Sequence, residues 1–176
     1  GRDFNGQTPQ SMLEIISQYQ NASPIPLLIA VDEEGGTVVR VSSNPAFRNQ
    51  KFRAPRRLYK DGGLERVLAE EQEKCFLLRS LGINVNLGPV CDLATDPNAF
   101  MYDRALGENA DITAQFADQI VSLMKANYVG SCLKHFPGYG NNADTHVGIA
   151  VDSRSLGELE AYDLLPFAAG IDAGAD

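Results

Sequence analysis

The sequence predicts an α/β fold built on a parallel β-sheet. Short apolar runs alternate with longer segments in which apolar residues recur at helical spacing. The apolar runs are continuous, as in strands buried on both faces, and charged residues follow where they end. The 176 residues, 44% of them hydrophobic, suffice for one compact domain. A barrel and a doubly wound sheet both fit this pattern.

The first helix and the first strand have clear boundary signals. Thr8 and Pro9 are typical of an N-cap and a first helical position, which predicts a helix over residues 9–20. The apolar run 27–31 is too short for a helix and ends at Asp32, so we expect a buried parallel strand there. Residues 1–4 look like the end of an earlier strand.

Two further helix–strand units follow. After a basic, irregular stretch through Tyr59, apolar residues between 64 and 81 share one helix face, and residues 83–87 predict a second strand. Asp111 is the expected N-cap of another amphipathic helix, and residues 131–133 are extended after it.

The C-terminal part repeats the pattern once more. Ser155 and Glu158 fit a capping box, and Pro166 divides the following helix into two pieces. Residues 175–176 look like the approach to another strand. No linker-like segment interrupts the sequence, so we treat residues 1–176 as one piece of a single domain.

Composition excludes some partners. A net charge of −8 argues against nucleic-acid binding, which requires clustered Lys and Arg. No apolar run approaches the roughly 18 residues of a membrane span, so nothing indicates membrane contact. Three widely spaced cysteines, Cys75, Cys91 and Cys132, predict small buried side chains rather than disulfides. Residues 1–4 show no signal-peptide pattern, and cytoplasmic and secreted or cell-envelope locations stay open.

A first polar cluster follows the first predicted strand. Residues 32–40, DEEGGTVVR, combine a carboxylate at Asp32, a double-glycine turn and the guanidinium of Arg40. The turn lets the chain fold back, so that both charges can contact one hydroxyl-rich ligand. An acidic, solvated surface turn paired with a nearby Arg explains the cluster equally well.

A second cluster, residues 134–146, contains both histidines of the chain. Asp144 lies two residues before His146 and can accept its imidazole N–H, which holds the ring as a proton donor or acceptor. Lys134 and His135, at the end of a predicted strand, can donate hydrogen bonds to sugar hydroxyls. A core-lining His beside a snorkelling Lys is the alternative.

A metal site is a further alternative. His135, His146, Asp144 and Asp92 could supply nitrogen and oxygen ligands. The sequence has no H-x-H, H-E-x-x-H or C-x-x-C pair, however, and Lys134 would put a cation beside the metal. We therefore expect no metal and no other cofactor.

Together these segments resemble glycoside hydrolase family 3, in its β-N-acetylglucosaminidase branch. Members carry D-x-E-G-G-x-V-x-R, which is complete at 32–40, and K-H-F-P-G-x-G followed by D-x-H, which is present at 134–146. Residues 86–92 and 103–107 look like the intervening family segments. The departures are Tyr139 in place of a common His, Asn141-Asn142 for Asp-Thr and Ile149-Ala150 for an apolar–Pro pair.

The resemblance implies a (β/α)₈ barrel of the TIM type. Such a barrel needs about 250 residues, so residues 1–176 would be the central part of one incomplete barrel domain. It also implies that Asp144 and His146 form an acid/base dyad, in contrast to β-glucosidases. It implies five contacts to the terminal sugar, from Asp32, Arg40, Arg104, Lys134 and His135.

The implied reaction is retaining hydrolysis of terminal β-linked N-acetylglucosamine, with peptidoglycan fragments as the natural glycan. A family Asp further along the chain is the nucleophile, so residues 1–176 alone are expected to be inactive, and exposed strand edges predict self-association. Two alternatives stay open. One is a non-catalytic sugar-binding module, and the other is a β-glucosidase-type exo-glycosidase of the same family.

Overall fold

The structure of the chain is a computed structural model that describes residues 2–107 and 109–176. Its centre is a parallel sheet of the order β1-β2-β3, with β1 at Ala30–Val31, β2 at Val85–Asn86 and β3 at Gly130–Ser131. The predicted α/β class with a parallel sheet is confirmed. Three strands do not form a closed barrel, so the (β/α)₈ architecture stays a prediction for the whole domain.

The strands are shorter than predicted because side chains interrupt the backbone ladder. Asn84 lies beside the segment before β1, where its Oδ1 accepts from the Ile29 amide at 2.7 Å and its Nδ2 donates to the Leu27 carbonyl at 3.0 Å. These side-chain bonds use the Leu27 carbonyl and the Ile29 amide, whereas the Ile29 carbonyl still accepts from the backbone amides of Asn84 and Val85 at 3.1 Å, so residues 27–29 lie outside the regular sheet.

The first two helices begin at proline. Helix α1 covers Pro9–Ala22 and confirms the predicted helix, with Thr8 as its N-cap. Helix α2 covers Pro55–Ser80 and is kinked at Gly62 and Gly63. The expected irregular stretch through Tyr59 is therefore wrong from Pro55 onward, because a first helical turn precedes the glycine kink.

Helix α3, Ala110–Ala126, is capped by Asn109 and not by Asp111. The Asn109 side chain accepts from the Ile112 amide at 2.8 Å, which leaves Asp111 in the first turn, where a negative charge suits the helix dipole.

The C-terminal helices follow the predicted division. The capping box of Ser155 is confirmed at the start of α4, Leu156–Glu158. A π-helical turn, η2, follows at Leu159–Asp163. Helix α5 covers Leu165–Asp172 and has Pro166 in its first turn. The strand end expected at residues 1–4 is wrong over Arg2–Phe4, which forms a 3₁₀ turn, η1. Residues 175–176 were expected only to approach a further strand, and the Asp176 carboxylate lies beside β3, where it accepts from the Ser131 amide at 3.0 Å.

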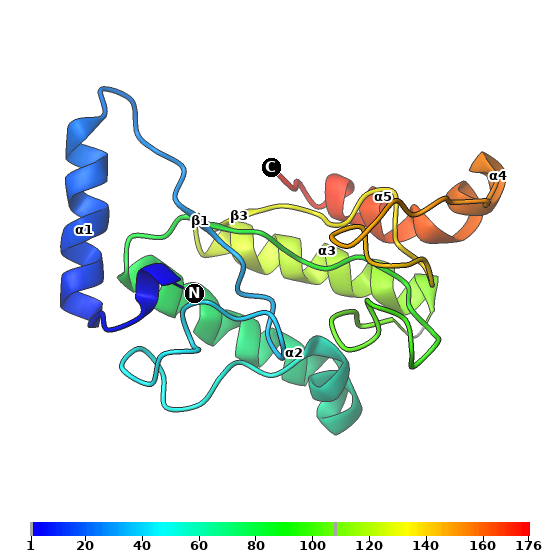
Figure 1. Cartoon of the computed structure of the whole chain (residues 1–176), viewed down its shortest axis with the longest axis horizontal. Coiled ribbons are helices and arrows are strands. Elements are labelled where there is room, and N and C mark those ends of the chain that lie inside the picture. Colours follow the sequence, from blue (N-terminus) through cyan, green and yellow to red (C-terminus); the bar gives the residue numbers. More distant parts are fainter. Residues whose placement is uncertain (1, 108) are drawn as a thin grey trace.

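Helices α2, α3 and α5 form one layer against the sheet (Figure 1). Helix α1 lies on the other side of β1, where Met12 and Ile16 pack in one core cluster with Val31, Leu81 and Ile83. The core between α2 and α3 includes Leu58, Cys75, Phe116, Ile120 and Met124. Cys75 and Cys91 are buried as predicted, but Cys132 is exposed, because successive residues of an extended segment face opposite sides and Ser131 takes the buried one. Within the described residues, no helix has both the length and the apolar content to cross a bilayer.

Candidate active site

The carboxyl ends of the three parallel strands bring the two polar clusters together. Residues 32–34 follow β1, Asp92 follows β2, and Lys134 and His135 follow β3. Asp32, Glu34, Lys134 and His135 line an open cavity of about 530 Å³, and the buried Glu33 and Asp92 lie behind it. All seven predicted site residues line this cavity: Asp32, Arg40, Arg104, Lys134, His135, Asp144 and His146.

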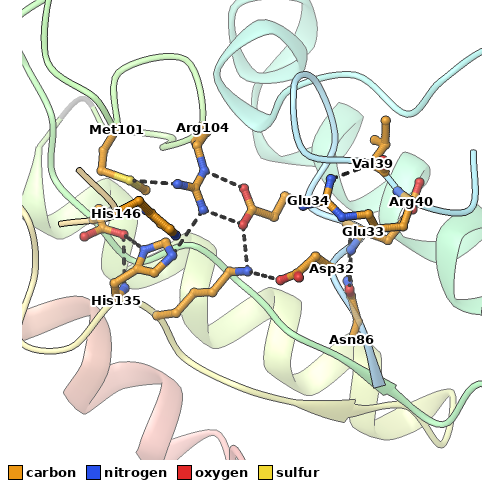
Figure 2. Close-up of polar contacts among 12 residues, drawn as sticks. Asp32, Glu33, Glu34, Val39, Arg40, Asn86, Met101, Arg104, His135 and His146 are labelled. Atoms are coloured by element: carbon orange, nitrogen blue, oxygen red, sulfur yellow. Dashed lines mark hydrogen bonds and ion pairs between the residues drawn. The ribbon is translucent and has the colours of Figure 1, made fainter. Parts of the chain in front are cut away.

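A network of ion pairs forms the floor of the cavity. Lys134 Nζ lies 2.8 Å from Asp32 Oδ1 and 2.6 Å from Glu34 Oε1. Arg104 binds the same Glu34 with two nitrogens, Nε at 2.9 Å and Nη2 at 2.8 Å (Figure 2). Two cations therefore share one buried carboxylate.

Asp32 and Glu34 have different roles in this network. The side chain of Glu34 is 1% exposed, and that of Asp32 is 37% exposed. Burial alone would raise the pKa of both groups, but hydrogen bonds and positive charge from Lys134 and Arg104 outweigh it and lower each pKa below its ordinary value. Asp32 is thus an ionised acceptor open to a ligand, whereas the Glu34 carboxylate is occupied by Lys134 and Arg104.

Asp92 fixes the position and tautomer of His135. The fully buried Asp92 carboxylate accepts from the backbone amides of His135, at 3.0 Å, and Tyr139, at 2.7 Å. Its Oδ2 also lies 2.7 Å from His135 Nδ1, and His135 Nε2 lies 3.1 Å from Arg104 Nη2. Because a guanidinium only donates, Nε2 accepts and Nδ1 carries the proton. Both ring nitrogens of His135 are therefore engaged, and it supports Arg104.

Asp144 and His146 form the expected contact. His146 Nδ1 lies 2.6 Å from Asp144 Oδ1, which also accepts from the His146 amide at 2.9 Å. That backbone hydrogen bond is the largest cause of the lowered pKa of Asp144. The His146 ring packs edge-on against Phe100, with centroids 6.0 Å apart, and its side chain is 74% exposed. With Nδ1 bound, Nε2 is the nitrogen that remains for proton transfer.

Glu33 shapes the turn that presents Arg40. Its fully buried carboxylate accepts from the amides of Arg40 and Val41, both at 2.7 Å. The double glycine is required here: Gly35 has φ +106°, and a Cβ on it would lie 2.3 Å from the Arg53 carbonyl oxygen. The chain therefore folds back as its sequence predicts.

Sequence reasoning missed several residues of the site. Glu34 and Glu33 belong to the motif already singled out, so their position directly after a buried strand was the available signal. Asp92 was noted as the polar residue that follows the second predicted strand, but the only role given to it was that of a metal ligand. Phe100 and Asp103 line the cavity from an irregular loop that has no periodic pattern. Among residues 2–107 and 109–176, no group of three or more His, Cys, Asp or Glu side chains is arranged to hold a metal ion.

Comparison with known proteins identifies the family. Residues 2–176 match the model of the glycosyl hydrolase family 3 N terminal domain. The chain belongs to this family. The resemblance inferred from the two motifs is thereby confirmed.

Similar proteins include two bacterial beta-hexosaminidases. That of Xanthomonas campestris pv. campestris (strain B100) is 38% identical over 99% of this chain and 53% of its own length. That of Xylella fastidiosa (strain M23) is 39% identical over 94% of this chain and 50% of its own length. The chain thus spans about half the length of these curated relatives.

Two solved structures share the fold of this chain. NagZ from Neisseria gonorrhoeae in complex with N-trifluoroacetyl-D-glucosamine superposes with a TM-score of 0.83 at 28% identity, covering 97% of this chain and 51% of NagZ. A family 3 β-N-acetylglucosaminidase from Paenibacillus sp. str. FPU-7 gives a TM-score of 0.88 at 27% identity, covering 98% of this chain and 33% of that protein.

Proposed function

We propose that the full-length protein is a retaining exo-glycosidase that releases terminal, non-reducing β-linked N-acetylglucosamine, with peptidoglycan fragments as the natural glycan. The observation that carries this proposal is the Asp144–His146 contact of 2.6 Å on the rim of the cavity whose floor holds Asp32 and Lys134. A proton-transfer group thus faces a site rich in partners for hydroxyl groups.

The floor of the cavity is proposed to bind the terminal sugar. Asp32 is ionised and open, so it accepts hydrogen bonds from sugar hydroxyls. Lys134 has three N–H donors, of which Asp32 and Glu34 engage two, and the third is available to a sugar oxygen. Arg40 and Arg104 line the same cavity and supply further donors, while His135 borders the site and holds Arg104.

His146 is proposed to act first as the acid and then as the base. It protonates the leaving oxygen as an Asp attacks the anomeric carbon, and then activates the water that hydrolyses the glycosyl-enzyme. Asp144 holds the ring and stabilises its charged form. The family resemblance implies that the nucleophile lies beyond the segment matched by residues 1–176, so we expect turnover from the full-length protein and none from this segment alone.

The test compares an aryl N-acetyl-β-glucosaminide with the matching aryl β-glucoside, using the full-length protein and its His146→Ala variant. We expect cleavage of the acetylated sugar only, and a loss of about 10²–10⁴-fold in kcat/KM on substitution. Preference for the glucoside would favour the β-glucosidase alternative. Sugar binding without turnover would favour the binding module, and a harmless substitution would remove His146 from the mechanism.

We also propose that residues 1–176 alone self-associate. Within the described residues β1 pairs only with β2, which leaves its other edge free. A cavity of about 430 Å³ lies between α1 and β1, and Leu28 beside it is 81% exposed. An open edge next to apolar surface favours association. Light scattering should therefore give a mass above 19.1 kDa, and a monomer at all concentrations would refute this.

A further inference from the structure

The loop that carries Asp144 and His146 is exposed along its middle. Three apolar side chains that follow His146 lie in solvent: Val147 is 85% exposed, Ile149 96% and Val151 82%. Packing of these residues therefore does not hold the loop over the cavity. Other contacts must fix its position, and the densest group of them lies at its ends, around Arg154.

Arg154 joins both ends of this loop. Its Nη2 donates to the carbonyl of Gly138, where the loop begins, at 2.6 Å. Its Nε and Nη2 contact the carboxylate of Asp152, where the loop ends, at 2.9 and 2.5 Å. Its Nη1 donates to Asp163 in η2 at 2.5 Å. One guanidinium thus ties the start and the end of the loop to the helical layer.

Two glycines let the backbone approach this guanidinium. A Cβ on Gly140 would lie 2.8 Å from Arg154 Nη1, and a Cβ on Gly138 would lie 3.2 Å from Asp163 Oδ1. Both glycines also have positive φ, +54° and +111°. The first turn of the loop is therefore shaped around the Arg154–Asp163 pair.

The two carboxylates that hold Arg154 differ in burial. Asp163 is 5% exposed, and burial raises its pKa even though Arg154 is bound to it. Asp152 is near solvent, and its hydrogen bond from Arg154 lowers its pKa to about 2. Arg154 reaches two carboxylates and a carbonyl with three nitrogens spread over a planar fork, whereas a lysine ammonium would offer its donors from a single point and could not span the same acceptors in this geometry.

We propose that Arg154 is a positioning residue that closes the base of the loop and thereby holds His146 at the leaving-group side of the cavity. This inference rests on the proposed glycosidase function. It assigns Arg154 an effect on proton donation and none on sugar binding, because Arg154 does not line the cavity that holds Asp32 and Lys134.

The test uses the dependence of kcat/KM on the leaving group, measured on the full-length protein. In a dinitrophenyl N-acetyl-β-glucosaminide the leaving group is a stable phenolate that departs without a proton. In the phenyl substrate the leaving oxygen must be protonated as it departs. We expect Arg154→Met to lower kcat/KM about 10–100-fold for the phenyl substrate and to leave the dinitrophenyl substrate nearly unchanged. Arg154→Lys should behave like Arg154→Met, because the fork is lost in both.

Two further variants keep the result interpretable. Arg48→Met removes a guanidinium that binds Glu73 with two nitrogens away from the cavity, and it should show no dependence on the leaving group. If Arg154→Met unfolds, the double variant R154M/D163N removes the unpaired buried carboxylate and takes its place. In either protein, hydrogen exchange of residues 139–151 should be faster than in the wild type.

His146→Ala separates the two hypotheses. If His146→Ala lowers kcat/KM equally for both substrates, the proposed acid role fails. If His146→Ala shows the leaving-group dependence but R154M, or R154M/D163N in its place, lowers both substrates equally or neither, the role of Arg154 is overturned.

Discussion

The floor of the cavity and the loop on its rim are built in opposite ways. On the floor, the contacts join distant parts of the sequence: Lys134 and Asp32 are 102 residues apart, and Arg104 and Glu34 are 70 apart. On the loop they are local: Asp144 and His146 are 2 residues apart, and Arg154 and Asp163 are 9 apart. The floor is therefore part of the fold, whereas the loop is organised largely by itself.

Because of this difference, we expect substitutions on the floor to affect stability and substitutions on the loop to affect catalysis. Removing a charge from the floor leaves buried partners without compensation, so we expect the fold and the geometry of the cavity to be lost together. Removing Asp144 or His146 from the loop leaves a partner that water can solvate, because the His146 side chain is 74% exposed and that of Asp144 is 26% exposed, so we expect the fold to be kept and proton transfer to be lost.

The largest effect is expected from Glu34→Gln. The substitution leaves Arg104 and Lys134, whose side chains are 12% and 13% exposed, without their shared charge. We expect a loss of about 3–5 kcal/mol in the free energy of unfolding, measured by urea denaturation. The matched change on the loop, Asp144→Asn, should leave the urea midpoint unchanged. Equal midpoints for the two variants would contradict the contrast between floor and loop.

A smaller loss in the free energy of unfolding is expected at acidic pH. Because the folded pKa of Glu34 lies below its ordinary value of 4.5, its contribution to stability is complete above that value and is lost as the pH falls through the folded pKa. Asp32 acts in the same direction from 3.8 downward. Urea midpoints of the wild type should fall as the pH drops below 4.5, and the fall should be shallower in Glu34→Gln. Parallel curves would show that Glu34 does not carry the acid sensitivity.

The contrast also explains what could be predicted from sequence. Asp32, Lys134 and His135 were predicted because parallel strands present their carboxyl ends on one side, and strand ends can be read from apolar runs. Asp144 and His146 were predicted because their contact is local. Both signals exist without knowledge of the fold.

Other features needed the tertiary structure. Phe100 and Asp103 reach the cavity because buried Arg56 binds the carbonyls of Ala94 and Tyr102, at 2.7 and 2.9 Å, and so holds their loop. The sequence of the loop itself does not predict these contacts with Arg56. The N-cap of α3 was placed at Asp111 because Asn and Asp are both good caps, and only the backbone turn selects Asn109.

The smallest effect is expected from Tyr139→Phe, which tests how the tip of the loop is held. The Tyr139 hydroxyl contacts Thr145 Oγ1, next to His146, while its ring packs on Phe100 and His135 with centroids 5.6 and 5.5 Å apart. Loss of the hydroxyl alone should lower kcat/KM for a phenyl substrate about 3- to 10-fold, as one hydrogen bond is worth ~1 kcal/mol.

Thr145→Val removes the same contact from the other side, so the double variant should lose no more than either single variant. If the two losses instead add in full, the hydroxyl pair does not hold the loop, and its position depends on the Arg154 clamp alone. If they do not add, the loop is fixed at both its base and its tip by local contacts. The position of His146 could then change in evolution without any change to the buried ion pairs on the floor of the cavity.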